Sequence, residues 1–325
     1  MTAPALTPAP AAPPAVTVVV PTYGRPAKLR ACLRALMDLH DPPGGYEVGV
    51  VDDGGPDDLA PIVREADPTG TRVHLHRQDN AGPARARNAG ARVARGGLLA
   101  FTDDDCRPEP GWLVALAAAH ARHPDALLGG HTWNERPDNL CAQASQDLLA
   151  FLYRDQQRRN GDAPFFASNN LAVSAERFAD LGGFDETFPL AAGEDREFCD
   201  RFHHAFAASA ADAPAAAAGP PPRALRFVSD AVVRHAHAMT PAQFWRQHRN
   251  YGRGALHFAA ARARHGRPGL STEGPRFYGG MLTEPWRTGP HHGRLRRAAL
   301  IFLSQAGTAS GYAAERRRSP RPAAG

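Results

Sequence analysis

Short apolar runs alternate with amphipathic stretches at the start of the chain. Residues 16–20 (VTVVV) and 46–51 (YEVGVV) suit strands that are buried on both faces of a parallel sheet. Between them, apolar residues recur at three- and four-residue spacing, which predicts a helix that begins near Pro26 and ends near His40. Strands that alternate with helices predict an α/β fold with a mostly parallel, doubly wound sheet, whose ligands bind at the carboxyl ends of the strands.

The alternation continues to residue 122, and helices dominate after it. An Ala- and Pro-rich stretch at 208–222 (ASAADAPAAAAGPPP) predicts a flexible surface insertion. The expected organisation is a disordered tail at 1–15, an α/β domain at 16–240 and a helical, basic extension at 241–325. Further strands are expected at 72–76, 98–102 and 225–229, and further helices at 58–66, 83–95, 111–122, 140–159, 241–263 and 295–309.

The cysteines and the apolar content bear on the compartment. The four cysteines are far apart and show neither a CxxC pair nor a zinc-finger spacing, which favours a reducing compartment. The first 15 residues lack the basic and apolar regions of a secretory signal, and no run reaches the roughly 18 to 20 apolar residues that span a bilayer. The expected location is the cytoplasm, with peripheral contact at the cytoplasmic face of the membrane as a further hypothesis.

Basic charge is concentrated at the C-terminal end. Residues 226–325 carry 17 arginines against four acidic residues, although the net charge of the chain is only +5. Such a segment attracts phosphate groups on a membrane surface, a lipid-linked acceptor or a nucleic acid, and plain solvation is the alternative. No recognised RNA or DNA module accompanies the arginines, so no specific nucleic-acid partner is expected. The arginine-flanked helix at 295–309 is the segment expected on a membrane.

Three consecutive carboxylates follow the apolar strand at 98–102. Asp103, Asp104 and Asp105 repel one another unless a divalent cation neutralises them, and their hard oxygen atoms suit Mg²⁺ or Mn²⁺ bound to a diphosphate. The alternative is a solvated acidic loop. The triplet therefore indicates a candidate metal site, which its surroundings must support.

Two other strand ends carry side chains that suit a nucleotide. Asp52 and Asp53 end the second apolar run and precede two glycines, so the backbone can approach a ligand and a carboxylate can bond a base or a ribose. In the small-residue segment 80–90, Arg87 can reach the same edge, and a plain surface helix is the alternative. The first run is followed by an aromatic face, a hydroxyl and a guanidinium, within the set Pro21, Thr22, Tyr23 and Arg25.

Seven short motifs stand in a defined order along the chain. They are PTY (21–23), VDDG (51–54), GPARARNAG (82–90), DDD (103–105), SNNLAV (168–173), GGFDE (182–186) and GED (193–195). In this order the chain resembles family 2 of the inverting glycosyltransferases, over roughly residues 16 to 255. The resemblance implies the GT-A fold, a nucleotide-diphosphate sugar donor and a divalent metal, Mg²⁺ or Mn²⁺.

The resemblance assigns a nucleotide site to the matching positions. Thr22 and Tyr23 would hold the base, and one of Asp52 and Asp53 would bond its ring N–H. The complete nucleotide site expected from the resemblance is Pro21, Thr22, Tyr23, Arg25, Asp52, Asp53, Arg87, Asp103 and Asp104.

The metal ligands follow from the same resemblance. Asp103 and Asp105 would be the DxD pair, although the extra acid Asp104 leaves open whether 103/105 or 104/105 touch the metal. A histidine that follows the strand near 225–229 resembles one that approaches the metal or the diphosphate in related enzymes. His235 is the expected ligand and His237 is less favoured, while a structural role is the alternative for both.

The resemblance also implies an acid–base role for two neighbouring acids. Asp195 would be the general base that removes the acceptor's proton, and Glu194 would support it or contact the acceptor. The alternative is a pair of acids placed at a helix N-terminus by the helix dipole, which does not exclude catalysis.

The expected function is transfer of a sugar from a UDP-, GDP- or dTDP-sugar to a glycan, a lipid-linked acceptor or a small molecule. A role in cell-envelope or polysaccharide biosynthesis is expected with it. A catalytically inactive binding or scaffold protein with the same fold is the first alternative. A nucleotidyltransferase is the second, although the Gly-rich, lysine-bearing phosphate loop expected of it is missing after the first strand.

Overall fold

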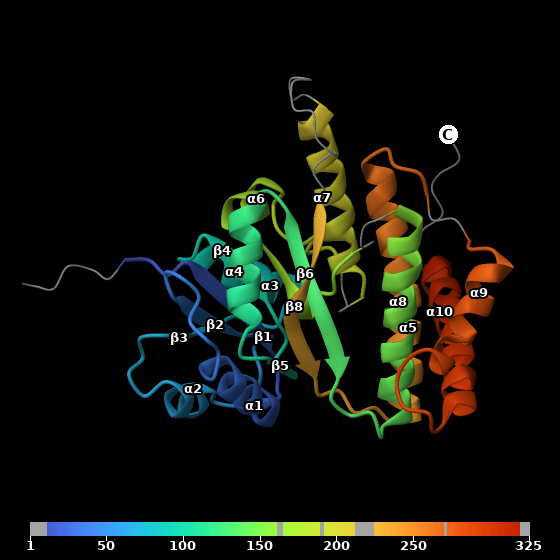
Figure 1. The fold of residues 1–325 in the computed structure, drawn as a ribbon, viewed down its shortest axis with the longest axis horizontal. Coiled ribbons are helices and arrows are strands. Elements are labelled where there is room, and N and C mark those ends of the chain that lie inside the picture. The colour runs from blue at the N-terminus through green and yellow to red at the C-terminus, as the bar shows by residue number, and fades with distance from the viewer. Residues whose placement is uncertain (1–11, 161–164, 189–191, 212–223, 270–271, 319–325) are drawn as a thin grey trace, which may run out of the picture.

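The chain folds around an eight-stranded sheet (Figure 1). The strand order across it is β3-β2-β1-β4-β7-β6-β8-β5. The strands are β1 Val16–Thr22, β2 Tyr46–Asp52, β3 Val73–Arg77, β4 Leu98–Phe101, β5 Cys106–Pro108, β6 Leu127–Asn134, β7 Leu171–Ser174 and β8 Leu225–His235. The computed structural model describes residues 12–160, 165–188, 192–211, 224–269 and 272–318.

Helices cover the sheet and continue beyond it. Most of the tail expected at 1–15 and of the insertion expected at 208–222 lies outside the described residues, and residues 208–211 continue α7. The helices are α1 Pro26–Met37, α2 Ala60–Ala66, α3 Pro83–Val93, α4 Trp112–Arg122, α5 Leu140–Asn160, α6 Ala175–Asp180, α7 Glu194–Ala211, α8 Pro241–Arg264, α9 Pro275–Leu282 and α10 Arg294–Arg318, with 3-10 turns at Ser168–Asn170 and Glu284–Trp286.

The sheet is mixed. β1 runs parallel to β2 and β4, and β2 runs parallel to β3, as the alternation of strands and helices predicts. β7 then pairs antiparallel with β4 and β6, β6 pairs parallel with β8, and β5 pairs antiparallel with β8. The sequence patterns did not predict β5, β6 or β7, and they predicted only the first half of β8.

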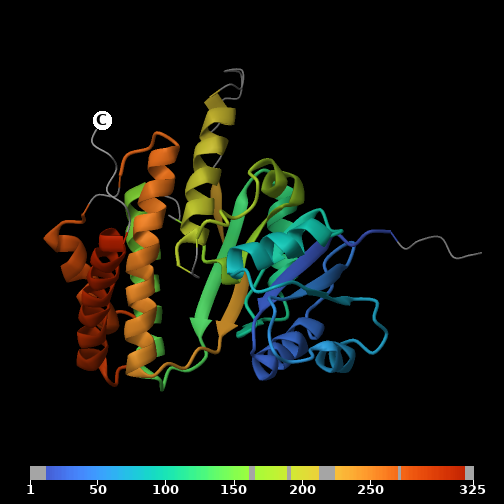
Figure 2. The ribbon, with the colours of Figure 1, turned by 180° about the vertical axis from the view of Figure 1, so that it is seen from behind.

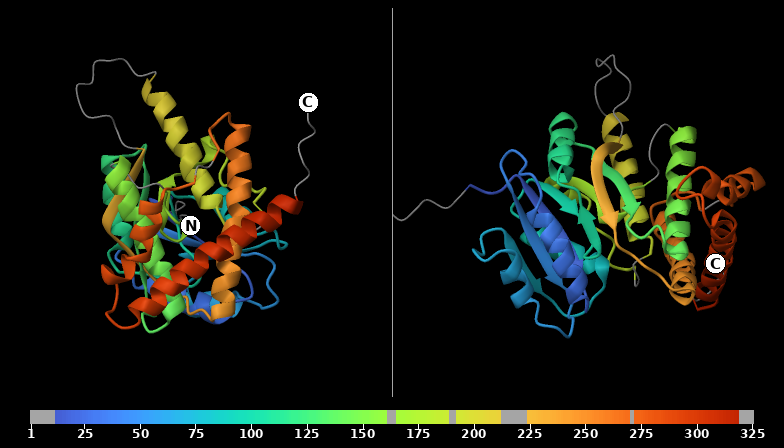
Figure 3. Two further views of the ribbon diagram at one scale, coloured as in Figure 1. Left: turned by 90° about the vertical axis from the view of Figure 1, so that its right-hand side faces the viewer. Right: turned by 60° about the horizontal axis from the view of Figure 1, so that its bottom comes forward.

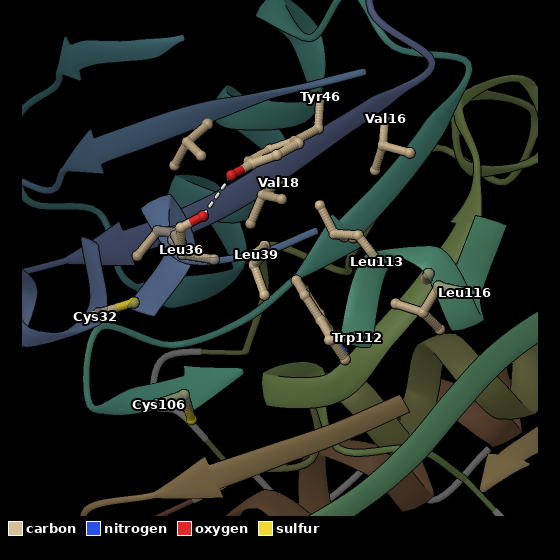
Figure 4. Packing of buried hydrophobic residues seen from close by; sticks show 14 of the residues in the cluster. Val16, Val18, Cys32, Leu36, Leu39, Tyr46, Cys106, Trp112, Leu113 and Leu116 are labelled. Carbon is tan, nitrogen blue, oxygen red and sulfur yellow. Dashed lines mark hydrogen bonds between the residues drawn. The ribbon is translucent and has the colours of Figure 1, made fainter. Parts of the chain in front are cut away.

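Both faces of the sheet are covered, which explains why β1 is almost wholly apolar. Val18 and Val20 pack in one cluster with α1, α2 and α4, whereas Val19 packs in a second with α3, α6 and α7, because neighbouring side chains of a strand point to opposite faces. Trp112 of α4 is fully buried in the first cluster (Figure 4). Its indole N–H donates to Oδ1 of Asn170 at 2.9 Å.

Helix α3 lies on the face of the sheet that Figure 2 brings forward. It approaches the sheet closely because it carries Gly90, where a Cβ would lie only 2.5 Å from Cγ1 of Val19. This contact sets the depth at which Arg87, one turn earlier on the same helix, lies in the molecule.

Helices α5, α8, α9 and α10 form a helical layer beside the sheet, and α10 runs obliquely across α8 (Figure 3). A fully buried ion pair between Asp147 and Arg297, at 2.6 Å, joins α5 to α10. The layer therefore includes α5 as well as residues from the extension expected at 241–325. Its own apolar cluster contains Cys141, Ala142, Ala144, Phe151, Met239, Phe244, Met281 and Ile301.

We predict that Gly252→Ala destabilises the protein through the contact between α8 and α10. A Cβ at this position would lie 1.8 Å from the carbonyl oxygen of Thr308, so one helix must move. Overpacking of this kind lowers the free energy of unfolding by about 1–3 kcal/mol. The matched control is Gly279→Ala in α9, where a Cβ meets no atom within 4 Å and alanine favours the helix. Chemical denaturation measures both variants. Equal losses in the free energy of unfolding for the two would contradict the close contact between α8 and α10.

Candidate active site

A cleft of about 1090 Å³ lies at the carboxyl ends of β1, β2 and β4. The loops after these strands form one wall, and α5, α8 and the start of α7 contribute to the others. Two of the predicted site residues, Asp52 and Asp104, do not line the cleft. Those that line it are Pro21, Thr22, Tyr23, Arg25, Asp53, Arg87, Asp103, Asp105, Glu194, Asp195 and His235.

The two carboxylates that end β2 have different surroundings. Asp53 reaches the cleft and accepts hydrogen bonds from the backbone N–H groups of Ala81 and Gly82, both at 2.9 Å. Asp52 does not line the cleft, and it pairs with the guanidinium of Arg77 at 2.9 Å. Asp53 is therefore the member of the pair that is placed to meet a ligand.

The middle acid of the triplet faces the interior. Asp104 is fully buried, accepts a hydrogen bond from the Thr22 hydroxyl at 2.6 Å and pairs with Arg25 at 2.7 Å. Burial raises the pKa of Asp104 to about 6, although Arg25 and Thr22 oppose the rise. Asp104 thus ties the loop after β1 to the acidic loop, while Asp103 and Asp105 line the cleft on either side of it.

Two histidines converge on Asp105. Nε2 of His235 lies 3.3 Å and Nδ1 of His237 lies 3.4 Å from its carboxylate oxygens. The antiparallel pairing of β5 and β8 causes this, because it sets Cys106 opposite His235 and lets the Ala236 N–H donate to the Asp105 carbonyl at 2.9 Å. Burial opposes ionisation of Asp105, but hydrogen bonds from both histidines lower its pKa well below the usual range.

The same three side chains suit a divalent cation. One donor atom from each of Asp105, His235 and His237 lies within 4.8 Å of the others. Carboxylate oxygen suits Mg²⁺ and Mn²⁺, and imidazole nitrogen binds several divalent transition metals. Nδ1 of His237 is buried and faces an Asp105 carboxylate oxygen at 3.4 Å, so both groups point to one position. Asp103 is not in this group, and its carboxylate pairs with Arg87 at 2.8 Å.

Arg87 connects the acidic loop to the start of α7. Its side chain is buried, and it bonds Asp103 at 2.8 Å with one terminal nitrogen and Glu194 at 3.0 Å with the other. Burial raises the pKa of Glu194, the neighbouring Asp195 adds to the rise, and Arg87 offsets only part of it. One guanidinium therefore holds two carboxylates that are distant in the sequence.

Asp195 is half-buried at the N-terminus of α7 and lines the cleft. Its carboxylate accepts a hydrogen bond from the Arg196 backbone N–H at 2.8 Å. Burial raises the pKa of Asp195, although the Arg196 charge opposes the rise. A carboxylate in a cleft with a raised pKa suits a general base.

Sequence reasoning undervalued or missed three neighbours of the site. His237 approaches Asp105 as closely as His235, and their spacing of two residues beside a strand end is the signal that both share one side. Lys28 lies 3.0 Å from the same carboxylate. His248 of α8 lines the opposite wall, and no local pattern marks it.

Solved structures with a similar architecture include proteins bound to nucleotide sugars. A mannosyltransferase from Pyrobaculum calidifontis, solved with GDP-Man and Mn²⁺, matches with a TM-score of 0.55 and 20% identity over 97% of this chain and 81% of that one. TarS from S. aureus, solved with UDP-GlcNAc, matches with a TM-score of 0.51 and 15% identity over 93% of this chain and 91% of that one. At such identities the likeness concerns the fold, which is of the GT-A type.

Sequence comparison identifies the family. The model of glycosyl transferase family 2 matches residues 17–182, so the chain belongs to this family, as its motifs indicate. Validoxylamine A glucosyltransferase of Streptomyces hygroscopicus subsp. limoneus is 32% identical over 58% of this chain and 48% of that protein. Glycosyltransferase AglE of Haloferax volcanii is 35% identical over 53% of this chain and 56% of that protein. The chain spans about half the length of these relatives.

We predict that Arg87→Met lowers the free energy of unfolding by about 3–5 kcal/mol, because it leaves a buried carboxylate without its counter-charge. The loss should shrink when the pH falls from about 8 to about 5. Without Arg87 the raised pKa of Glu194 rises further, so protonation at lower pH removes the buried charge from the folded state. Urea denaturation at both pH values measures the effect.

The matched control is Arg85→Met on the same helix. Arg85 is more than half exposed and pairs with Glu186 at 2.8 Å, so a loss below about 1 kcal/mol with little pH dependence is expected. Equal losses for the two variants would contradict the bridging role of Arg87.

Proposed function

We propose that the protein transfers a sugar from a UDP-, GDP- or dTDP-sugar to a hydroxyl group of an acceptor, with inversion at the anomeric carbon. The observation that carries the proposal is one cleft that contains both a carboxylate suited to take a proton, Asp195, and the acid–histidine group of Asp105, His235 and His237. Membership of glycosyl transferase family 2 supports it. A glycan, a lipid-linked sugar and a small molecule are the acceptor classes that this chemistry admits.

The nucleotide would bind at the ends of β1 and β2. The ring of Tyr23 is 53% exposed in the cleft and can stack on a base, while Asp53 can accept a hydrogen bond from the base or the ribose. The side chain of Arg25 is 42% exposed on the same wall and can face the diphosphate, whereas both terminal nitrogens of Arg87 are bonded to Asp103 and Glu194.

A divalent cation, Mg²⁺ or Mn²⁺, would be held by Asp105, His235 and His237, with Asp103 beside them. When bound, such a cation supplies positive charge that stabilises a departing diphosphate. The P. calidifontis mannosyltransferase was solved with Mn²⁺.

Asp195 would carry the proton transfer. Its carboxylate takes the proton of the acceptor hydroxyl as that oxygen bonds to the anomeric carbon, and the bond from this carbon to the diphosphate breaks with its electron pair on the leaving oxygen. One displacement inverts the anomeric centre, so no second carboxylate is needed as a nucleophile. Glu194, bonded to Arg87, would position the acidic loop relative to the base.

An inactive scaffold with the same fold is the alternative of a different class. Loss of Asp195 or of the acid pair would favour it, and these residues are present and line the cleft. A nucleotidyltransferase is disfavoured because the segment Pro21–Arg25 carries neither a glycine-rich run nor a lysine.

We expect the purified protein to release a nucleotide diphosphate slowly from one donor in a panel of nucleotide sugars with Mn²⁺. This release should stop when EDTA is added. In the Asp103→Ala, Asp105→Ala double variant the rate of release should fall about 100-fold or more, because charge stabilisation at the leaving group is lost. Release is measured by a coupled assay for the nucleotide diphosphate.

The control for this experiment is Asp125→Ala, which removes an exposed acid that pairs with Arg177 on the surface. It should hydrolyse the donor as fast as the unaltered protein. Absence of release from every donor, together with absence of nucleotide binding by calorimetry, would favour the scaffold.

We also propose that the outer face of α10 rests on an anionic membrane surface. Leu295 is 77% exposed and Phe302 is 67% exposed on this face, and Arg296 and Arg316 flank it. The acids of the described segment 272–318 are paired with arginines elsewhere, so they do not balance this charge: Glu273 with Arg159, Glu284 with Arg154 and Glu315 with Arg253. No helix in the described part of the chain is long and apolar enough to cross a membrane.

Flotation with lipid vesicles tests this placement. The protein should float with vesicles that contain phosphatidylglycerol and stay behind with pure phosphatidylcholine, because the arginines attract anionic headgroups. Leu295→Glu with Phe302→Glu should weaken flotation about tenfold or more, since both side chains would be buried in the interface. Val114→Glu, at a partly exposed position on α4, is the control. Equal flotation of both variants would refute the proposal.

A further inference from the structure

The helical wall of the cleft has a different character from the wall at the sheet edge. Aspartates, arginines and histidines line the sheet edge, whereas Arg246 is the one charged side chain among the described residues of α5, α8, α9 and α10 that line the cleft. The apolar side chains of this helical wall include Leu148, Leu149, Leu152, Phe258, Phe277 and Met281, and uncharged polar side chains such as Gln146, Gln243, Gln247 and Asn250 lie among them.

Two buried polar atoms in the helical wall have no partner among the described residues. They are Nε2 of His248 and Oγ of Ser145. Burial lowers the pKa of His248 to about 4, so its imidazole is neutral near pH 7 and offers one hydrogen bond at Nε2. A buried polar group without a partner is costly, and a ligand that supplies one removes the cost.

The helical wall begins directly beside the proposed base. Helix α8 packs so closely on the loop before Asp195 that a Cβ at Gly254 would lie 1.8 Å from the carbonyl oxygen of Ala192. Burial raises the pKa of Tyr251 on α8, and the nearby Asp195 carboxylate adds to the rise. An acceptor with a hydroxyl at Asp195 therefore has the rest of its body against α8 and α5.

We infer that the acceptor is amphipathic, with an apolar or aromatic portion that packs on the helical wall and a hydroxyl group at Asp195. The inference rests on the proposed function, because Asp195 defines where the hydroxyl lies. A purely hydrophilic glycan would leave the leucines and phenylalanines of the helical wall exposed to water, so its binding would bury little apolar surface. An apolar portion that carries a polar group matches the mixture of apolar and uncharged polar side chains on the helical wall.

Matched glycosides test the inference. Methyl and octyl β-glucoside carry the same sugar and differ only in the apolar chain, and calorimetry with the full chain measures their binding below the concentration at which octyl glucoside forms micelles. Octyl glucoside should bind about tenfold more tightly or better, because its methylene groups leave water.

Two variants assign the preference to the helical wall. Phe258→Ser on α8 and Leu152→Asn on α5 should each remove most of it, and both positions are only partly buried, so folding should persist. Val114→Ser on α4, at a partly exposed position away from the cleft, is the control and should keep the preference.

Equal binding of the two glucosides, or a preference that survives both substitutions, would overturn the inference. Nucleotide diphosphate release from the donor, followed in parallel, separates this from failure of the proposed function. A protein that hydrolyses a donor but shows no preference refutes only the amphipathic acceptor. A protein that releases nothing from any donor and binds no nucleotide refutes the transferase proposal.

Discussion

The guanidinium of Arg87 is the group on which the arrangement of the site depends. It is buried between Asp103 and Glu194, so it holds the acidic loop after β4 at a set distance from the start of α7. Buried carboxylates without this charge would be strongly destabilising. The depth of Arg87 in turn depends on Gly90, which lets α3 lie against β1. The packing of one helix thus sets the spacing between the acidic loop after β4 and Asp195.

Close backbone contacts have a similar effect on the other side of the cleft. Gly254 lets α8 meet the loop that leads to Asp195, and Gly252 lets α10 lie directly on α8. The cleft therefore lies between two separately packed parts, a sheet whose strand ends carry charges and a helical layer whose inner side is almost uncharged and rich in leucine and phenylalanine. The charged and the apolar side chains of the cleft thus come from different parts of the fold.

Some motifs that resemble site segments mainly hold the backbone. Asn88, in the GPARARNAG motif, donates to the Phe184 carbonyl and accepts from the Phe184 N–H, both at 2.9 Å, so it ties α3 to the GGFDE motif. Asn170, in the SNNLAV motif, bonds Trp112 and the carbonyls of His131 and Ala231. These side chains place the walls of the cleft without lining the donor side themselves.

The sequence by itself determined the parallel half of the sheet and the carboxylates at its strand ends, because apolar runs and the residues that follow them are local features. Asp53, Asp103 and Asp105 were found in this way, whereas Asp195 at the start of α7 came from the resemblance to the family; all four line the cleft. Only the tertiary structure decided that Asp104 turns inward and that His237 joins His235 at Asp105. Both depend on pairing between distant segments, above all β5 with β8. The free energy of such contacts depends on residues far apart in the sequence, so no short stretch of the chain predicts it.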